Sequence, residues 1–194
     1  MENKLSKWIC NQLCEYQVID KEYKDVYVYG LELILSFLIT SSIILAVGIL
    51  FRQTVPTLTF LITFVVIRKY TGGYHANSYI MCKLCTLISF GISVYFANVF
   101  PMPQYMFPIL LIIGCLIILL FGPIENIHKP LTIQEKKKHK ITALILFILW
   151  CVVGFVTSFL VPIISNTILY TLCIIIILMI IPLFERRKHY EKAR

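Results

Sequence analysis

A chain of 194 residues with 59% hydrophobic and only 14% charged side chains has too few charges to cover the surface of a soluble domain, which usually carries about a quarter. Its mean hydropathy of +0.84 instead indicates a membrane protein, with enough length for one helical bundle. The net charge of +8 comes from basic residues between apolar runs, not from a continuous stripe. This pattern favours contact with membrane lipids over binding to nucleic acid.

Residues 1–30 combine mixed charges with many aromatic side chains, and Trp8, Ile9, Leu13, Tyr16 and Val18 suggest an amphipathic helix at the membrane interface. The six apolar runs that follow are 31–51, 55–67, 84–100, 105–121, 141–161 and 163–184. The second run has only about 13 residues, against the ~20 that a spanning helix needs. We predict an all-α, polytopic membrane bundle with about six hydrophobic segments, formed by residues 1–194 as a single domain.

The distribution of basic residues predicts the orientation of this bundle. With six spans and a cytoplasmic N-terminus, 17 of the 18 Lys and Arg residues lie on the cytoplasmic side, and only Arg52 lies outside. The positive-inside rule favours this arrangement. Both termini, the polar segment 68–83 and the basic loop 122–140 are therefore predicted to be cytoplasmic. Residues 1–17 lack the apolar core and cleavage site of a signal peptide.

Seven cysteines, an odd number scattered through apolar runs, argue against a framework of disulfides. Cys10 and Cys14, four residues apart, are a weak candidate pair for metal binding or lipidation. We predict neither a metal site nor a cofactor.

The densest group of polar residues lies in segment 68–83, where His75 and Cys82 suggest a nucleophile and its base. On a continuous helix they would share a face but lie ~10.5 Å apart along the axis. Gly72 and Gly73 can break the helix, so that His75 lies on a loop and a new helix begins before Cys82. The helix dipole and a neighbouring lysine would then favour a thiolate.

Other interpretations of these residues remain open. A single histidine or cysteine at a membrane interface is more often structural, and Arg68 can be a simple interface anchor. Cys85 is a rival nucleophile, although it lies one turn deeper in an apolar run, where a thiolate is costly. Glu32, at the start of the first apolar run, either extends to the interface or pairs inside the bundle with Arg68 or His75.

The chain resembles the accessory gene regulator B family of bacterial quorum-sensing peptidases over nearly its whole length. The family's signature, Arg-x4-Gly-x-His-Ala-x5-Cys, is matched by Arg68, Gly73, His75, Ala76 and Cys82. The proline-bearing basic loop 122–140 also resembles the central cytoplasmic segment of that family.

The resemblance implies a membrane cysteine endopeptidase at the cytoplasmic face of the bacterial cell membrane. Cys82 would cleave the C-terminal tail from a signalling-peptide precursor, with His75 as general base and then acid. A Cys or Ser of the peptide would capture the thioester to form a cyclic thiolactone or lactone. Arg68 and Gly73 would contact the substrate carboxylate or oxyanion and shape the loop, and Glu32 would orient His75 or bind substrate. The resemblance also implies a homodimer and a precursor with an amphipathic helix and an acidic tail.

Two rival classes explain the same sequence without catalysis. A membrane peptide exporter or binding protein would use His75 and Cys82 structurally, and a Cys82→Ala variant would keep its activity. A transmembrane assembly protein would be held together by small residues such as Gly91 and Ser93, and would contain no reactive thiol.

Overall fold

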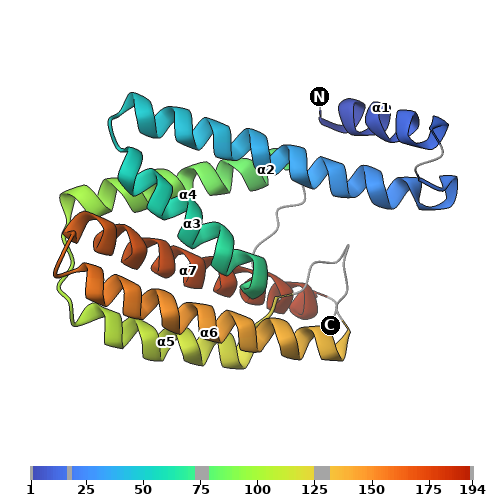
Figure 1. Ribbon diagram of the computed structural model, residues 1–194. Helices are drawn as coiled ribbons and strands as arrows, with labels where there is room; N and C mark the ends of the chain where they lie inside the picture. Colours follow the sequence, from blue (N-terminus) through green and yellow to red (C-terminus); the bar gives the residue numbers. More distant parts are fainter. Residues whose placement is uncertain (1, 17–18, 73–78, 125–131, 193–194) are drawn as a thin grey trace. The chain divides into compact units, whose positions relative to one another are not determined.

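A computed structural model describes residues 2–16, 19–72, 79–124 and 132–192 (Figure 1). Within these ranges every regular element is helical, and the one β-type contact is an isolated bridge between Gly72 and Ile124. The prediction of an all-α protein is confirmed. The elements are α1 (Glu2–Glu15), the short 3-10 helix η1 (Lys21–Tyr23), α2 (Lys24–Leu50), α3 (Thr54–Thr71), α4 (Tyr79–Val99), α5 (Met106–Phe121), α6 (Ile133–Thr157) and α7 (Pro162–Lys192).

Each predicted apolar run lies on one helix from α2 to α7. In the described part of the chain, four segments are long and apolar enough to cross a membrane, namely Lys24–Leu50, Met81–Val99, Ile133–Thr157 and Pro162–Pro182. The short second run is extended by the next polar residues, because α3 continues to Thr71 and reaches 18 residues, or ~27 Å. The apolar helix α5 has 16 residues. The predictions that α3 and α5 also span the membrane and that both termini are cytoplasmic stay predictions.

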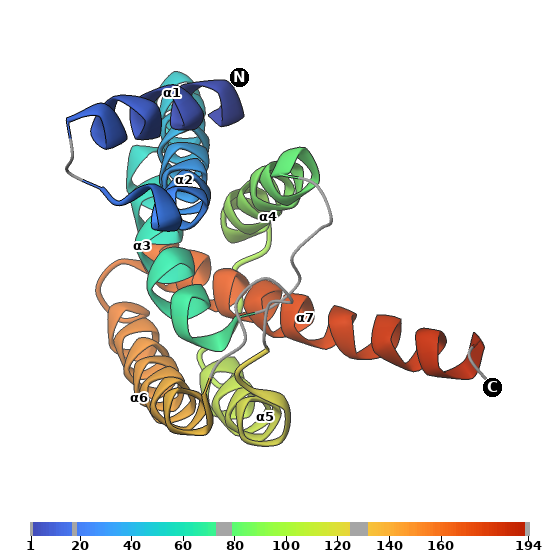
Figure 2. The same cartoon turned by 90° about the vertical axis from the view of Figure 1, so that its right-hand side faces the viewer.

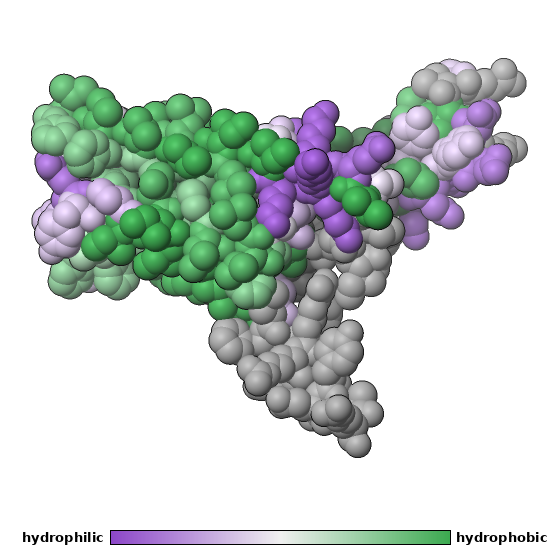
Figure 3. All heavy atoms as spheres, turned by 90° about the horizontal axis from the view of Figure 1, so that it is seen from below, coloured by the Kyte–Doolittle hydropathy of each residue, from purple (hydrophilic) through white to green (hydrophobic). Residues whose placement is uncertain are grey.

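The surface of the helices supports a lipid environment. Large apolar side chains are exposed on α5 and α6, among them Ile112 at 68% and Ile145 at 60% exposure. Figure 3 shows hydrophobic side chains over this face and hydrophilic ones gathered at the end where α6 begins. A soluble monomer rarely exposes such a large apolar surface. Lipid tails are the solvent that makes this surface stable.

The chain forms two compact units, residues 1–47 and residues 48–194, and each is described separately. In the first unit, α1 (Glu2–Glu15) lies within the region predicted to form an interfacial helix and includes Trp8, Ile9 and Leu13. Its Leu5 is 46% exposed and its Trp8 is 61% exposed. Exposed apolar and aromatic side chains on a short helix are typical of binding to a membrane surface.

The second unit is built around α7. The apolar window of α7 is 61% buried, against 28% for α4 and 22% for α6. Helices α3, α4, α5 and α6 all contact α7 and lie around it (Figure 2). The core side chains of α7 include Ile168, Leu169, Leu172, Ile175 and Met179.

Hydrogen bonds between helices hold α4 against α7. The hydroxyls of Ser93 and Thr171 are 2.8 Å apart, and both side chains are buried. The Tyr170 hydroxyl donates to the carbonyl of Phe100 at 2.8 Å. Polar contacts of this kind stabilise helix pairs in a bilayer, where the hydrophobic effect between helices is weak. They position α4, the helix that carries Cys82.

Candidate active site

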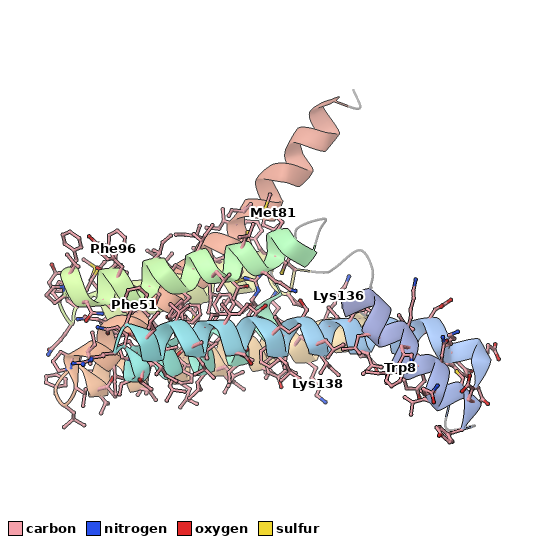
Figure 4. The ribbon with its side chains drawn as sticks, turned by 90° about the horizontal axis from the view of Figure 1, so that it is seen from above. Trp8, Phe51, Met81, Phe96, Lys136 and Lys138 are labelled. Atoms are coloured by element: carbon pink, nitrogen blue, oxygen red, sulfur yellow. The ribbon has the colours of Figure 1, made fainter. Side chains whose placement is uncertain are left out.

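Two of the polar segments predicted to be cytoplasmic meet at one end of the second unit. Met81, one residue before Cys82, lies at one end of α4 and Phe96 near the other, and Lys136 and Lys138 mark the beginning of α6 at the Met81 end (Figure 4). A backbone hydrogen bond joins the two connections, because the Ile124 amide donates to the carbonyl of Thr71 at 3.0 Å. The two segments, which are distant in sequence, therefore lie side by side at the candidate active site.

Gly72 ends α3 at this site, as the sequence predicted. Its amide donates to the Arg68 carbonyl at 3.1 Å, and its backbone has φ +68° and ψ −144°. This conformation is essentially restricted to glycine. A Cβ at Gly72 would also collide with the carbonyl oxygen of Ile124. The close approach of the two connections thus requires glycine at this position, whereas Gly73 lies outside the described residues.

Arg68, in the last turn of α3, is half-buried, and its guanidinium lies 5.0 Å from the centre of the Phe64 ring. Burial lowers the pKa of Arg68, and the nearby thiols of Cys82 and Cys85 act in the opposite direction. Both sulfurs are therefore close enough to interact electrostatically with this cation. Arg68 and Cys82 therefore lie within electrostatic range of each other, and their common catalytic site stays a prediction.

Cys82 lies in the first turn of α4, as predicted, and Cys85 lies one turn further along the helix. Both side chains are half-buried, whereas Cys151 in α6 is only 2% exposed. The hydroxyl of Thr86 donates to the Cys82 carbonyl at 3.0 Å, and that of Ser89 donates to the Cys85 carbonyl at 2.7 Å. The predicted base His75 lies outside the described residues.

His139, on α6, also lies at this end of the unit. It is half-buried on α6, and its ring centre lies 5.6 Å from that of Tyr70 in an edge-to-face arrangement. Helix α6 begins within the predicted loop, at Ile133, because Thr132 and Glu135 form a capping box. The Thr-x-x-Glu pattern in the sequence could have revealed this start.

Glu32 lies inside α2, in the first unit, and its side chain is buried. Glu32 lies at the start of the apolar run, but the helix begins eight residues earlier, at Lys24. Glu32 therefore does not stand at the first turn of the helix. Polar side chains at the start of α2 extend the helix beyond its apolar run. The pairing of Glu32 with Arg68 or His75 stays a prediction.

The cysteines of α1, Cys10 and Cys14, show little sign of a separate metal-binding or reactive site. Burial raises the pKa of Cys10, and the neighbouring Cys14 thiol adds to this effect. Thiolate formation is thereby opposed, and the thiolate is the form that binds metals and reacts. Across the ranges that the structure describes, no group of three His, Cys, Asp or Glu residues could hold a metal ion.

Helices suited to a bilayer, with a polar end that carries two thiols beside an arginine, define a polytopic membrane protein. The chain belongs to the accessory gene regulator B family, whose model matches residues 3–185. This membership implies a role in processing the autoinducer peptide of a quorum-sensing system. The family predicted from the signature is confirmed.

Curated relatives support the assignment along most of the chain. The chain is 29% identical to putative AgrB-like protein 2 of Clostridium perfringens, over 76% of this chain and 75% of that protein. It is 26% identical to accessory gene regulator protein B of Staphylococcus carnosus, over 74% and 75%. A putative AgrB-like protein of Halalkalibacterium halodurans is 28% identical, over 81% and 79%. No solved structure gives a significant match.

Proposed function

We propose that this protein is a membrane cysteine endopeptidase that removes the C-terminal tail of a signalling-peptide precursor and promotes cyclisation of the product. The observation that carries the proposal is that the Cys82 thiol, in the first turn of α4, lies within electrostatic range of the Arg68 guanidinium. Cysteines that act as nucleophiles often lie near a helix N-terminus and a cation. The family signature places His75 seven residues before this sulfur.

The reaction begins when the Cys82 thiolate attacks the carbonyl carbon of the bond before the tail. His75 takes the thiol proton and then delivers it to the leaving amine of the tail. The tetrahedral intermediate carries a negative oxygen, and Arg68, which interacts electrostatically with the Cys82 thiol, is the proposed cation that stabilises it. A thioester between Cys82 and the shortened peptide remains.

A nucleophile inside the bound peptide then completes the reaction. Its Cys thiol or Ser hydroxyl attacks the thioester carbonyl, closes a thiolactone or lactone ring, and returns the thiol of Cys82. Exchange of one thioester for another has nearly no net energy change, so hydrolysis must be avoided. The half-buried position of Cys82 and Arg68 limits the access of water to the intermediate.

The positive charge at this end of the second unit is complementary to an acidic peptide tail. Lys137 and Lys138 are exposed on the first turns of α6, and Lys69 is exposed at the end of α3. Complementary charges guide association and orientation more than they raise affinity. The proposal includes a cytoplasmic active site, a homodimer, and a precursor whose amphipathic helix lies on the membrane surface.

Reconstitution into lipid vesicles with a synthetic precursor tests this function against a peptide exporter without protease activity. We expect mass spectrometry to detect the released tail, the cyclic product, and a protein adduct equal in mass to the enzyme plus precursor minus tail. Intact precursor that crosses the vesicle membrane, with no tail and no adduct, would instead identify an exporter.

Because Gly72 lies against Ile124, a single methyl group added at Gly72 is predicted to have a strong effect on the rate of tail release. We expect Gly72→Ala to slow tail release by about tenfold or more, because the strained backbone costs ~1–3 kcal/mol and the Cβ meets the Ile124 carbonyl. Rates of tail release measured on vesicles check this. Gly91→Ala is the matched control, since a Cβ at Gly91 has no neighbour within 4 Å. Equal rates for both variants would show that the contact between the connections is dispensable.

A further inference from the structure

Cys85 has no role in the proposed reaction, yet it shares the electrostatic environment of Cys82. Both thiols act on Arg68, both are half-buried, and both lie on the first two turns of α4. All seven cysteines are free thiols. A Cys-x-x-Cys pair near a helix N-terminus and beside a cation has the features that make cysteines reactive toward oxidants.

The spacing of the pair is compatible with a disulfide. On a helix, residues three apart have Cα atoms about 5 Å apart, inside the usual range of roughly 4.4–6.8 Å for a disulfide. Their Cβ atoms are about 5–6 Å apart, whereas a disulfide needs roughly 3.5–4.5 Å. Formation of the bond therefore requires a small local distortion of α4.

Helix α4 has features that permit this distortion. The Thr86 and Ser89 hydroxyls bond to the carbonyls of Cys82 and Cys85, one turn before each donor. Such hydroxyl contacts weaken and bend helices. The remaining distortion would make the disulfide easy to reduce, which suits a reversible modification.

We propose that Cys82 and Cys85 form a reversible disulfide that switches off the enzyme when a hydroperoxide is present. The Cys82 thiolate attacks one peroxide oxygen and becomes a sulfenic acid, and the other oxygen leaves as water or an alcohol once protonated. The Cys85 thiol then attacks the sulfenic sulfur, which forms the disulfide and releases water. The two thiols are oxidised by two electrons and the peroxide is reduced by two.

The consequences follow from the loss of the free Cys82 sulfur. The disulfide removes the nucleophile, and it also protects Cys82 from irreversible oxidation to sulfinic acid. Two molecules of a small thiol restore both cysteines and become a disulfide themselves. The effect on cleavage rests on the proposed function, but formation of the disulfide does not.

The test treats the protein, held in lipid nanodiscs, with hydrogen peroxide. After oxidation and alkylation of the remaining thiols, proteolysis at Lys83 separates the two cysteines, so their disulfide links two peptides. We expect mass spectrometry to detect this linked pair and dithiothreitol to remove it. Absence of the linked pair, or linkage of Cys82 to another cysteine, would overturn the proposal.

Cleavage of the precursor gives a second readout. Dithiothreitol should restore the peroxide-treated wild type to most of its initial rate, while Cys85→Ala should be active before peroxide but recover less than about a tenth afterwards. Cys151→Ala, which changes a deeply buried thiol, should recover like the wild type. Equal recovery of Cys85→Ala and wild type would refute protection by Cys85. Linked peptides in a protein that never cleaves the precursor would refute the proposed function and leave the disulfide pair intact.

Discussion

Cys82→Ala is expected to reduce release of the tail from a co-expressed precursor by at least about 10³-fold, because the variant cannot form the acyl-enzyme. The nucleophile splits a difficult amide cleavage into two easier steps, and Cys85, one turn further along α4, is not expected to replace its sulfur. Intact-mass analysis of the peptides in cells that express both proteins measures the ratio of tail to precursor. The membrane level of the variant should match that of the wild type.

Cys85→Ala is the matched control for this prediction. It removes an equally half-buried thiol from the same helix and beside the same arginine. Under reducing conditions it should release the tail within about twofold of the wild-type rate, a change worth less than 0.5 kcal/mol at ~1.4 kcal/mol per tenfold. Loss of cleavage in Cys85→Ala, together with normal cleavage in Cys82→Ala, would assign the nucleophile to Cys85.

Arg68→Ala is expected to slow tail release by about 10²–10³-fold, the usual effect of removing one group that stabilises a developing oxyanion. Alkylation of Cys82 by iodoacetamide at pH 7 should also become slower, because Arg68 interacts electrostatically with this sulfur. Arg68→Lys should recover part of both rates, since it keeps the charge but not the planar guanidinium. Lys69→Ala, which removes an exposed cation next in sequence, should change either rate little.

Kinetic constants separate the two roles considered for Arg68. A fall in kcat with KM unchanged indicates contact with the oxyanion, because such an interaction exists only in the transition state. A rise in KM with kcat unchanged indicates a contact with a carboxylate of the substrate. Wild-type alkylation and cleavage rates in Arg68→Ala would remove this residue from the site.

The helices were predictable because their signals are local. Long apolar runs identify α2, α4, α6 and α7, and the glycine pair identifies the end of α3. Boundaries were less accurate where polar residues continue a helix. The early start of α2 at Lys24 and of α6 at Ile133 extended both beyond their apolar runs.

The candidate site was predictable only in part. The spacing of the signature predicted Cys82 and Arg68 as site residues, and their roles stay predictions. Ile124 could not be identified, because it contributes only backbone atoms to its contact with Gly72, and any residue type has them. The contact of His139 with Tyr70 depends on how α3 and α6 pack, so the sequence did not reveal it.

The sequence by itself determined that this protein is a helical membrane protein of the accessory gene regulator B family, because composition, apolar runs and signature spacing are all properties of neighbouring residues. Only the tertiary structure decided that Arg68 lies within electrostatic range of two thiols and that Gly72 meets Ile124. These contacts join segments that are separate in the chain. Their formation depends on how α3, α4 and α6 pack around α7, and packing between helices has no local signature.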